Sequence, residues 1–159
     1  MLQRVLIEAA GGPIALEAEL IGSGARLIVF LHEGLGSVAS WGDWPRTLCA
    51  AAGCRGLVFS RYGYGRSQRR PPGQVWPSDY LGIEAREHLP ALFHALAIDP
   101  AREAPILFGH SDGATIALQY AAAFPQAAAA VIVLAPHLFA EPMARARIEQ
   151  MRQGWQDGR

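Results

Sequence analysis

The apolar positions of this chain change period along its length. Over 5–7 and 16–20, apolar residues alternate with charged or small ones on either side of a turn at 11–13, which predicts a β-hairpin with one buried face. Continuous apolar runs follow, as expected for parallel strands that are covered on both faces. They fall at 27–31, 56–60, 104–108 and 129–134.

Helical periods lie between these runs, over 44–52, 78–96 and 111–123. Asp43 is placed to cap the first helix, Ser78 or Asp79 the second, and Pro90 is expected to kink the second. Strands that alternate with helices predict a doubly wound α/β fold with a mostly parallel sheet. Counting the hairpin as two, the chain supplies six strands.

The segment 1–140 therefore reads as one α/β domain, and 141–159 as a terminal amphipathic helix. Ala144, Ile148, Met151 and Trp155 are spaced to form one apolar stripe on that helix. The stripe has three alternatives: it packs on the domain itself, it begins a lid over the sheet, or it meets a partner. That partner is either a second copy of the chain or a C-terminal half.

Composition narrows the function classes. The 14 basic and 14 acidic residues give a formal net charge of zero, which argues against nucleic acid or an anionic membrane as a partner. All basic residues are arginine, so neither a Walker A loop nor Schiff-base chemistry is expected. Cys49 and Cys54 fit no disulfide scaffold and no metal spacing. With no signal peptide and no apolar run of about 20 residues, a cytoplasmic protein without metal or cofactor is expected.

The strongest motif is Gly109-His110-Ser111-Asp112-Gly113, which follows an apolar strand and precedes an alanine-rich helix. This is a G-x-S-x-G nucleophile elbow, in which the glycines make room for a tight strand-to-helix turn. The motif predicts Ser111 as a nucleophile raised above the sheet at a helix N-terminus. The alternative is that Ser111 only caps the helix.

Three motifs together resemble the α/β-hydrolase family. They are the elbow, the segment Leu31–Ser37 after a strand, and the segment Ser60–Ser67. The second is similar to the family's His-Gly-x oxyanion loop, with Glu33 in place of the first glycine. The third is similar to its Asp-x-x-Gly-x-Gly-x-Ser segment, with Ser60 in place of the aspartate. The resemblance covers nearly the whole chain up to about residue 141.

The resemblance implies an eight-stranded sheet with the nucleophile after the fifth strand and an acid and a histidine further on. On that pattern the chain is an N-terminal core, truncated after its sixth strand, and the portion with the family's acid and histidine is absent. The resemblance also implies an oxyanion hole made by the backbone N–H groups of Gly34 and Asp112.

The five histidines are the candidates for the base that would activate Ser111. His88 and His94 are expected at the surface or half-buried on the long helix, and His32 and His110 are expected to shape the two motif loops. His137 follows a strand at its carboxyl end, the edge where open parallel sheets bind ligands. It is either a contact at the rim of the active site or a stand-in base for Ser111.

The remaining polar residues of these motifs have plainer interpretations. The carboxylate of Asp112 suits a helix N-terminus, so only its N–H is assigned to the site. Glu33 is expected to fix its loop, with substrate contact as the alternative. Arg66, Arg69 and Arg70 are expected to form a solvated cluster.

These observations predict a serine hydrolase that cleaves a carboxylic ester or related small acyl substrate through an acyl-enzyme at Ser111. Acyltransferase, C–C hydrolase and perhydrolase activities would use the same elbow. The alternative from another class is a non-catalytic fragment or interaction module on a hydrolase scaffold, which needs a second segment.

Overall fold

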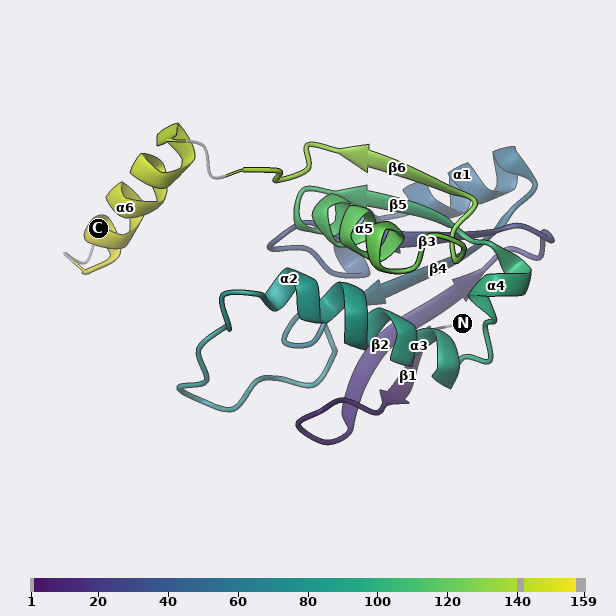
Figure 1. Cartoon of the computed structure of the whole chain (residues 1–159), viewed down its shortest axis with the longest axis horizontal. Coiled ribbons are helices and arrows are strands. Elements are labelled where there is room, and N and C mark those ends of the chain that lie inside the picture. The colour runs from purple at the N-terminus through teal and green to yellow at the C-terminus, as the bar shows by residue number, and fades with distance from the viewer. Residues whose placement is uncertain (1, 140–141, 157–159) are drawn as a thin grey trace.

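The sheet is mixed and has six strands, in the order β1-β2-β4-β3-β5-β6 (Figure 1). The structure is a computed structural model that describes residues 2–139 and 142–156. The strands are β1 Leu2–Ile7, β2 Ile14–Ile21, β3 Leu27–Leu31, β4 Arg55–Ser60, β5 Ile106–His110 and β6 Ala130–Leu134. The α-helices are α1 Trp44–Ala52, α2 Tyr80–Ile83, α3 Leu89–Ala95, α4 Pro100–Glu103, α5 Asp112–Ala123 and α6 Pro142–Gln156.

The first two strands form the predicted hairpin, and the rest of the sheet is parallel. β1 pairs with β2 and β2 with β4 in antiparallel register, whereas β3 pairs with β4 and β5, and β5 with β6, in parallel register. In Figure 1, α3 and α5 lie on one face of the sheet and α1 on the other. The predicted doubly wound, mostly parallel α/β fold is therefore confirmed.

Each face of the sheet has its own apolar core. The larger core contains Leu31, Leu92 and Tyr120, and the smaller one contains Phe30 and Cys49. Successive residues of β3, such as Phe30 and Leu31, point to opposite faces. All five residues of β3 are buried because helices cover both faces, which explains its unbroken apolar sequence.

The long helix is irregular close to Pro90. It is continuous, and a π-helical turn, Glu84–His88, joins α2 to α3 immediately before Pro90. Proline cannot donate to the preceding turn and its ring crowds the carbonyl there, so a wider turn accommodates it. His88 is buried beside Glu84, 3.0 Å away, and the expected surface position is wrong.

Three polar side chains, those of Asp43, Asp79 and Arg70, also differ from the sequence prediction. Asp43 and Asp79 occupy N-cap positions, but neither side chain caps its helix. The Asp79 carboxylate pairs instead with Arg86. Arg66 and Arg69 are exposed as expected, whereas the Arg70 guanidinium is half-buried over the ring of Trp76, 3.4 Å from its centroid.

Helix α6 stands apart from the sheet (Figure 1). Ile148, Met151 and Trp155 of the predicted stripe are between 66% and 86% exposed. The side chain of Ala144, the first member of the stripe, lies outside the described residues. Within residues 2–139 and 142–156, no helix has the length and hydropathy to cross a bilayer.

Candidate active site around Ser111

Ser111 occupies a strained turn between β5 and α5. Its φ of 54° and ψ of −115° are rare for a residue with a side chain. The turn requires both flanking glycines: a Cβ at Gly109 would lie 2.3 Å from the Gly113 carbonyl oxygen, and a Cβ at Gly113 only 1.9 Å from that of Leu31. The Ser111 N–H donates to the Leu134 carbonyl at 2.8 Å, which ties the elbow to the end of β6.

His137 lies directly against the Ser111 side chain. Its Nε2 is 2.9 Å from Ser111 Oγ. Ala135 turns the chain back toward α5 with a φ of 50°. The Thr115 hydroxyl then holds the His137 backbone at both ends, accepting from its N–H at 2.8 Å and donating to its carbonyl at 3.3 Å. The histidine is thus anchored to the helix that begins next to Ser111.

The Asp112 carboxylate also lies close to His137, on the buried side of the site. Its residue is only 8% exposed. Oδ2 accepts a hydrogen bond from the Tyr80 hydroxyl at 3.0 Å and lies 3.5 Å from both terminal nitrogens of Arg61. Oδ1 is 3.8 Å from His137 Nε2. The carboxylate therefore carries its negative charge between a buried cation and the imidazole.

Arg61 is completely buried, and every side of its guanidinium is engaged. Nη2 donates to the Glu33 carbonyl at 2.8 Å, and the guanidinium carbon lies 4.7 Å above the Tyr64 ring. The Arg61 backbone N–H donates to His32 Nε2 at 3.0 Å. Arg61 therefore connects the loop after β3, the loop after β4 and the first residue of α5.

His32 is a neutral structural residue in this network. Burial, reinforced by the Arg61 charge, lowers the pKa of His32 to about 3. Its Nδ1 donates to the Glu33 carbonyl at 2.7 Å, and its Nε2 accepts from Arg61. With one nitrogen as donor and the other as acceptor, the ring fixes the loop and has no free site for proton transfer.

The two tyrosines near Asp112 remain protonated donors at neutral pH. Burial, and then the adjacent Asp112 charge, raise the pKa of Tyr80 to about 12. Burial also raises the pKa of Tyr64. Tyr80 therefore presents its proton to Asp112 throughout the physiological pH range.

Gly34 lies beside Asp112, since a Cβ at Gly34 would be 3.2 Å from Oδ2. Within the described residues, the Gly34 amide donates to no other group. Glu33 folds back over its own loop, and a Cβ at Gly36 would lie 1.8 Å from its Oε2. Only glycine at position 36 leaves room for that carboxylate.

Ser60, which replaces an aspartate of the family pattern, is supported by a carboxylate from a neighbouring strand. The Ser60 hydroxyl donates to Glu17 Oε2 at 2.7 Å, and the Arg66 N–H donates to the same oxygen at 2.9 Å. The Val38 N–H donates to the Ser60 hydroxyl at 2.9 Å. Glu17 of β2 thus brings a negative charge to the loop that starts at position 60.

A cavity of about 690 Å³ adjoins this cluster. Asp112, His137 and Tyr80 form its polar part, and Leu138 and Phe139 lie on its apolar side. Arg145 and Ile148 of α6 complete the lining. This volume is within the range of cavities that hold small organic molecules.

The structure brings together Ser111, Asp112, Gly34 and His137, and places Glu33 next to them. His88 and His94 lie elsewhere, on the helix that runs from Tyr80 to Ala95. The sequence interpretation missed three residues of the site, namely Arg61, Tyr80 and Thr115. Thr115 had a usable signal, because it is one helical turn from Ser111 and so faces the same way.

Comparison with known proteins agrees with the geometry. Residues 26–157 match the family described as alpha/beta hydrolase fold. No curated protein matches the chain.

Several solved structures match the chain closely in three dimensions. An esterase from Thermogutta terrifontis is 24% identical with a TM-score of 0.71, over 91% of this chain and 50% of that one. A haloalkane dehalogenase from Agrobacterium tumefaciens is 25% identical with a TM-score of 0.69, over 95% and 49%. An epoxide hydrolase from Vigna radiata is 23% identical with a TM-score of 0.67, over 92% and 44%. At these identities the likeness is one of fold, and the chain spans about half the length of each.

Proposed function

Because the chain belongs to the alpha/beta hydrolase fold family, we propose that it is the part of a serine hydrolase that carries the nucleophile, Ser111. The substrate is a carboxylic ester or a related small acyl compound. The observation that carries the proposal is the 2.9 Å contact between Ser111 Oγ and His137 Nε2 on a strained elbow. A nucleophile within hydrogen-bond reach of a base is the arrangement that acyl transfer to serine needs.

In this mechanism His137 is the general base. It takes the Ser111 proton as Oγ attacks the substrate carbonyl, and the bond between Oγ and the carbonyl carbon gives a tetrahedral oxyanion. The N–H groups of Asp112 and Gly34 stabilise the oxyanion. The resulting imidazolium returns the proton to the leaving alcohol, and a water molecule, activated in the same way, releases the acid.

The Asp112 carboxylate serves the imidazolium. Its Oδ1 lies 3.8 Å from Nε2, so its charge favours the protonated ring that forms during attack. An uncompensated carboxylate here would oppose the oxyanion. Arg61 and Tyr80 stabilise the Asp112 carboxylate. In this mechanism they also offset its negative charge, so that it does not oppose the oxyanion.

The same acyl-enzyme would serve an acyltransferase, a C–C hydrolase or a perhydrolase, and the acceptor distinguishes these. A non-catalytic interaction module is the second candidate. The exposed Ile148, Met151 and Trp155 of α6 favour it, because large apolar side chains gathered on one element often mark a contact surface.

The deciding experiment is intact-mass analysis of the chain after exposure to a fluorophosphonate. We expect one adduct, which is absent in Ser111→Ala and forms at least ~100-fold more slowly in His137→Asn, since a general base contributes about that much or more. His94→Asn, at an exposed histidine of α3, is the matched control and should react at the wild-type rate.

Each other outcome has a defined meaning. Absence of an adduct in the wild-type chain favours the interaction module. Persistence of the adduct in Ser111→Ala contradicts the assigned nucleophile. Equal labelling rates in the wild type and His137→Asn remove His137 from the role of base and leave Ser111 in place.

A further inference from the structure

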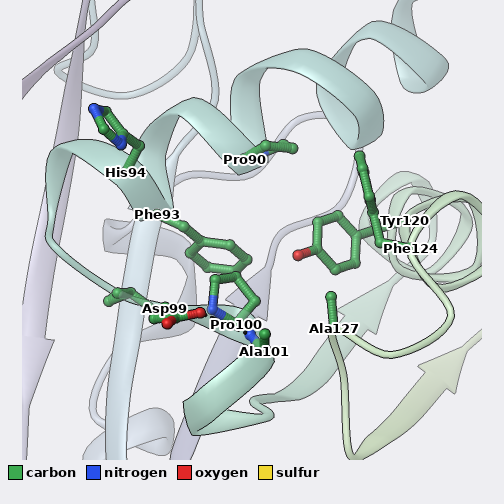
Figure 2. Close-up of a pocket in the computed structure, with 10 residues that line it drawn as sticks. Pro90, Phe93, His94, Asp99, Pro100, Ala101, Tyr120, Phe124 and Ala127 are labelled. Atoms are coloured by element: carbon green, nitrogen blue, oxygen red, sulfur yellow. Dashed lines mark hydrogen bonds between the residues drawn. The ribbon is translucent and has the colours of Figure 1, made fainter.

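A second cavity, of about 470 Å³, lies at the end of α5 remote from the nucleophile. It is a groove open to solvent on one side, and α3, α4, the C-terminal part of α5 and the loop that follows line it (Figure 2). Ser111 precedes the first residue of α5 and Tyr120 is near its last, so about 13 Å of helix separates the two sites. Neither the nucleophile nor His137 lines this cavity.

The distinctive group in this cavity is the Tyr120 hydroxyl. The residue is 2% exposed, and Figure 2 shows its oxygen directed toward the space beside Phe93 and Pro100. Within residues 2–139 and 142–156, the hydroxyl donates to no protein group, and its oxygen reaches the open side of the cavity, where a ligand could replace water. Burial raises the pKa of Tyr120 to about 12, so the group is a donor at any physiological pH.

The walls around this donor are apolar and well packed. The Phe93 ring meets Tyr120 edge to face, with centroids 5.8 Å apart, and the Phe124 ring lies 4.9 Å from Tyr120. Pro90 and Ile98 extend the apolar lining. Such walls suit a ring or a short hydrocarbon body.

The charged groups of the cavity exclude an anion. The Asp99 carboxylate lines it and already accepts the Ala101 N–H at 3.0 Å, and its negative charge remains. The lining has three titratable side chains, those of Asp99, Tyr120 and His94. His94 is exposed at the rim. Asp99 is exposed, so its charge disfavours an anion without providing a buried partner for a cation, and a neutral ligand with one acceptor suits the hydroxyl donor.

We propose that this cavity is a separate binding site for a neutral, mainly apolar carbonyl compound, whose oxygen accepts the hydrogen bond of Tyr120 and whose ring packs on Phe93 and Phe124. The site is independent of the proposed hydrolase chemistry. It stands on the unpartnered hydroxyl of a buried side chain, directed into an aromatic cavity.

The test is titration of the isotope-labelled chain with acetophenone, followed by amide chemical shifts. We expect the shifted amides to lie in 90–101 and 120–127. Tyr120→Phe removes only the hydroxyl and should weaken acetophenone binding about fivefold, the usual effect of one neutral hydrogen bond. Ethylbenzene, which has the ring but no acceptor, should bind wild type and Tyr120→Phe equally.

Two further variants separate this site from the first. Ala127→Leu fills the cavity and should abolish binding, whereas Tyr80→Phe removes a tyrosine hydroxyl at the other site and should leave binding unchanged. The proposal is overturned by the absence of binding at millimolar acetophenone, by equal affinity in the wild type and Tyr120→Phe, or by shifts confined to 135–139. Because the readout is binding alone, a failure of the fluorophosphonate reaction does not affect it.

Discussion

Replacing Arg61 by methionine tests the electrostatic design of the Ser111 site. Methionine preserves much of the length and the apolar contact with Tyr64 but removes the cation. Asp112 would then retain a negative charge at 8% exposure, with the Tyr80 hydroxyl and the N-terminus of α5 but no buried cation to stabilise it. Arg61 also donates to the Glu33 carbonyl, and that hydrogen bond is lost as well.

The expected loss of stability follows from these contacts. Breaking a buried ion pair by removing one partner costs about 3–5 kcal/mol, chiefly because the other charge remains. The two Arg61–Asp112 contacts are long, at 3.5 Å, which favours the lower end of that range. We therefore expect the free energy of unfolding of Arg61→Met to fall by about 3 kcal/mol at pH 7.

The double variant Arg61→Met with Asp112→Asn separates charge from packing. It leaves no buried charge at this position, and the asparagine oxygen can still accept from Tyr80, so we expect it to be more stable than Arg61→Met alone.

Urea unfolding followed by tryptophan fluorescence gives the free energy of unfolding of the wild type, Arg61→Met and the double variant. Arg69→Met is the control. Arg69 is an exposed arginine of the same loop, and its loss should change the stability by less than about 0.5 kcal/mol. The reasoning is refuted if Arg61→Met loses under about 1 kcal/mol. It is also refuted if adding Asp112→Asn recovers nothing.

Two further predictions concern residues around the same network. Thr115→Val removes the hydroxyl that holds the His137 backbone and should slow fluorophosphonate labelling of Ser111 about tenfold, while Thr115→Ser keeps the hydroxyl and the rate. Equal rates in the valine and serine variants would contradict this. His32 has a pKa lowered from 6.5 to about 3, so its contribution to stability is complete above pH 6.5 and is lost as the pH falls toward 3. Between pH 6.5 and 4.5 the wild type should lose roughly 2 kcal/mol more than His32→Gln in urea unfolding, and parallel losses would show that His32 does not titrate in this way.

The sequence predicted the order and type of the main elements, though not the short helix α4, because each main element has a strong local pattern. The continuous apolar run of β3 indicates a strand buried on both faces, and the alternation in the hairpin indicates strands buried on one face. The limits of β5 were less visible: the structure extends it to His110, since the strand continues through Gly109 up to the turn at Ser111. Glycine at 109 is needed for close approach to α5 and does not end the strand.

The parts that sequence reasoning missed depend on segments that are distant in the chain. Arg61 is in a loop rich in glycine and arginine, where a solvated side chain is the ordinary expectation. It is buried only because Glu33 and Asp112 arrive from two other segments, 28 and 51 residues away. A contact between such distant segments cannot be predicted from the sequence around Arg61.

The turn before Pro90 shows a similar limit. The proline was a sound indication of an irregular helix, but the sequence did not say whether the helix would bend or widen. In the structure one turn is widened, and Leu89 and Leu92, on either side of Pro90, are both buried in the larger core. Widening one turn preserves these contacts.

The position of Thr115 on the first turn of α5 has a consequence for how the site forms during folding. Ser111, Thr115 and His137 all belong to one continuous β5-α5-β6 unit, and the nucleophile and the histidine are 26 residues apart. Contacts of short sequence separation require little loop closure, so they form early and recover quickly after local opening. We therefore expect the pairing of Ser111 with His137 to form within one crossover, and the charge balance supplied by Arg61 to follow once β3 and β4 have joined the sheet.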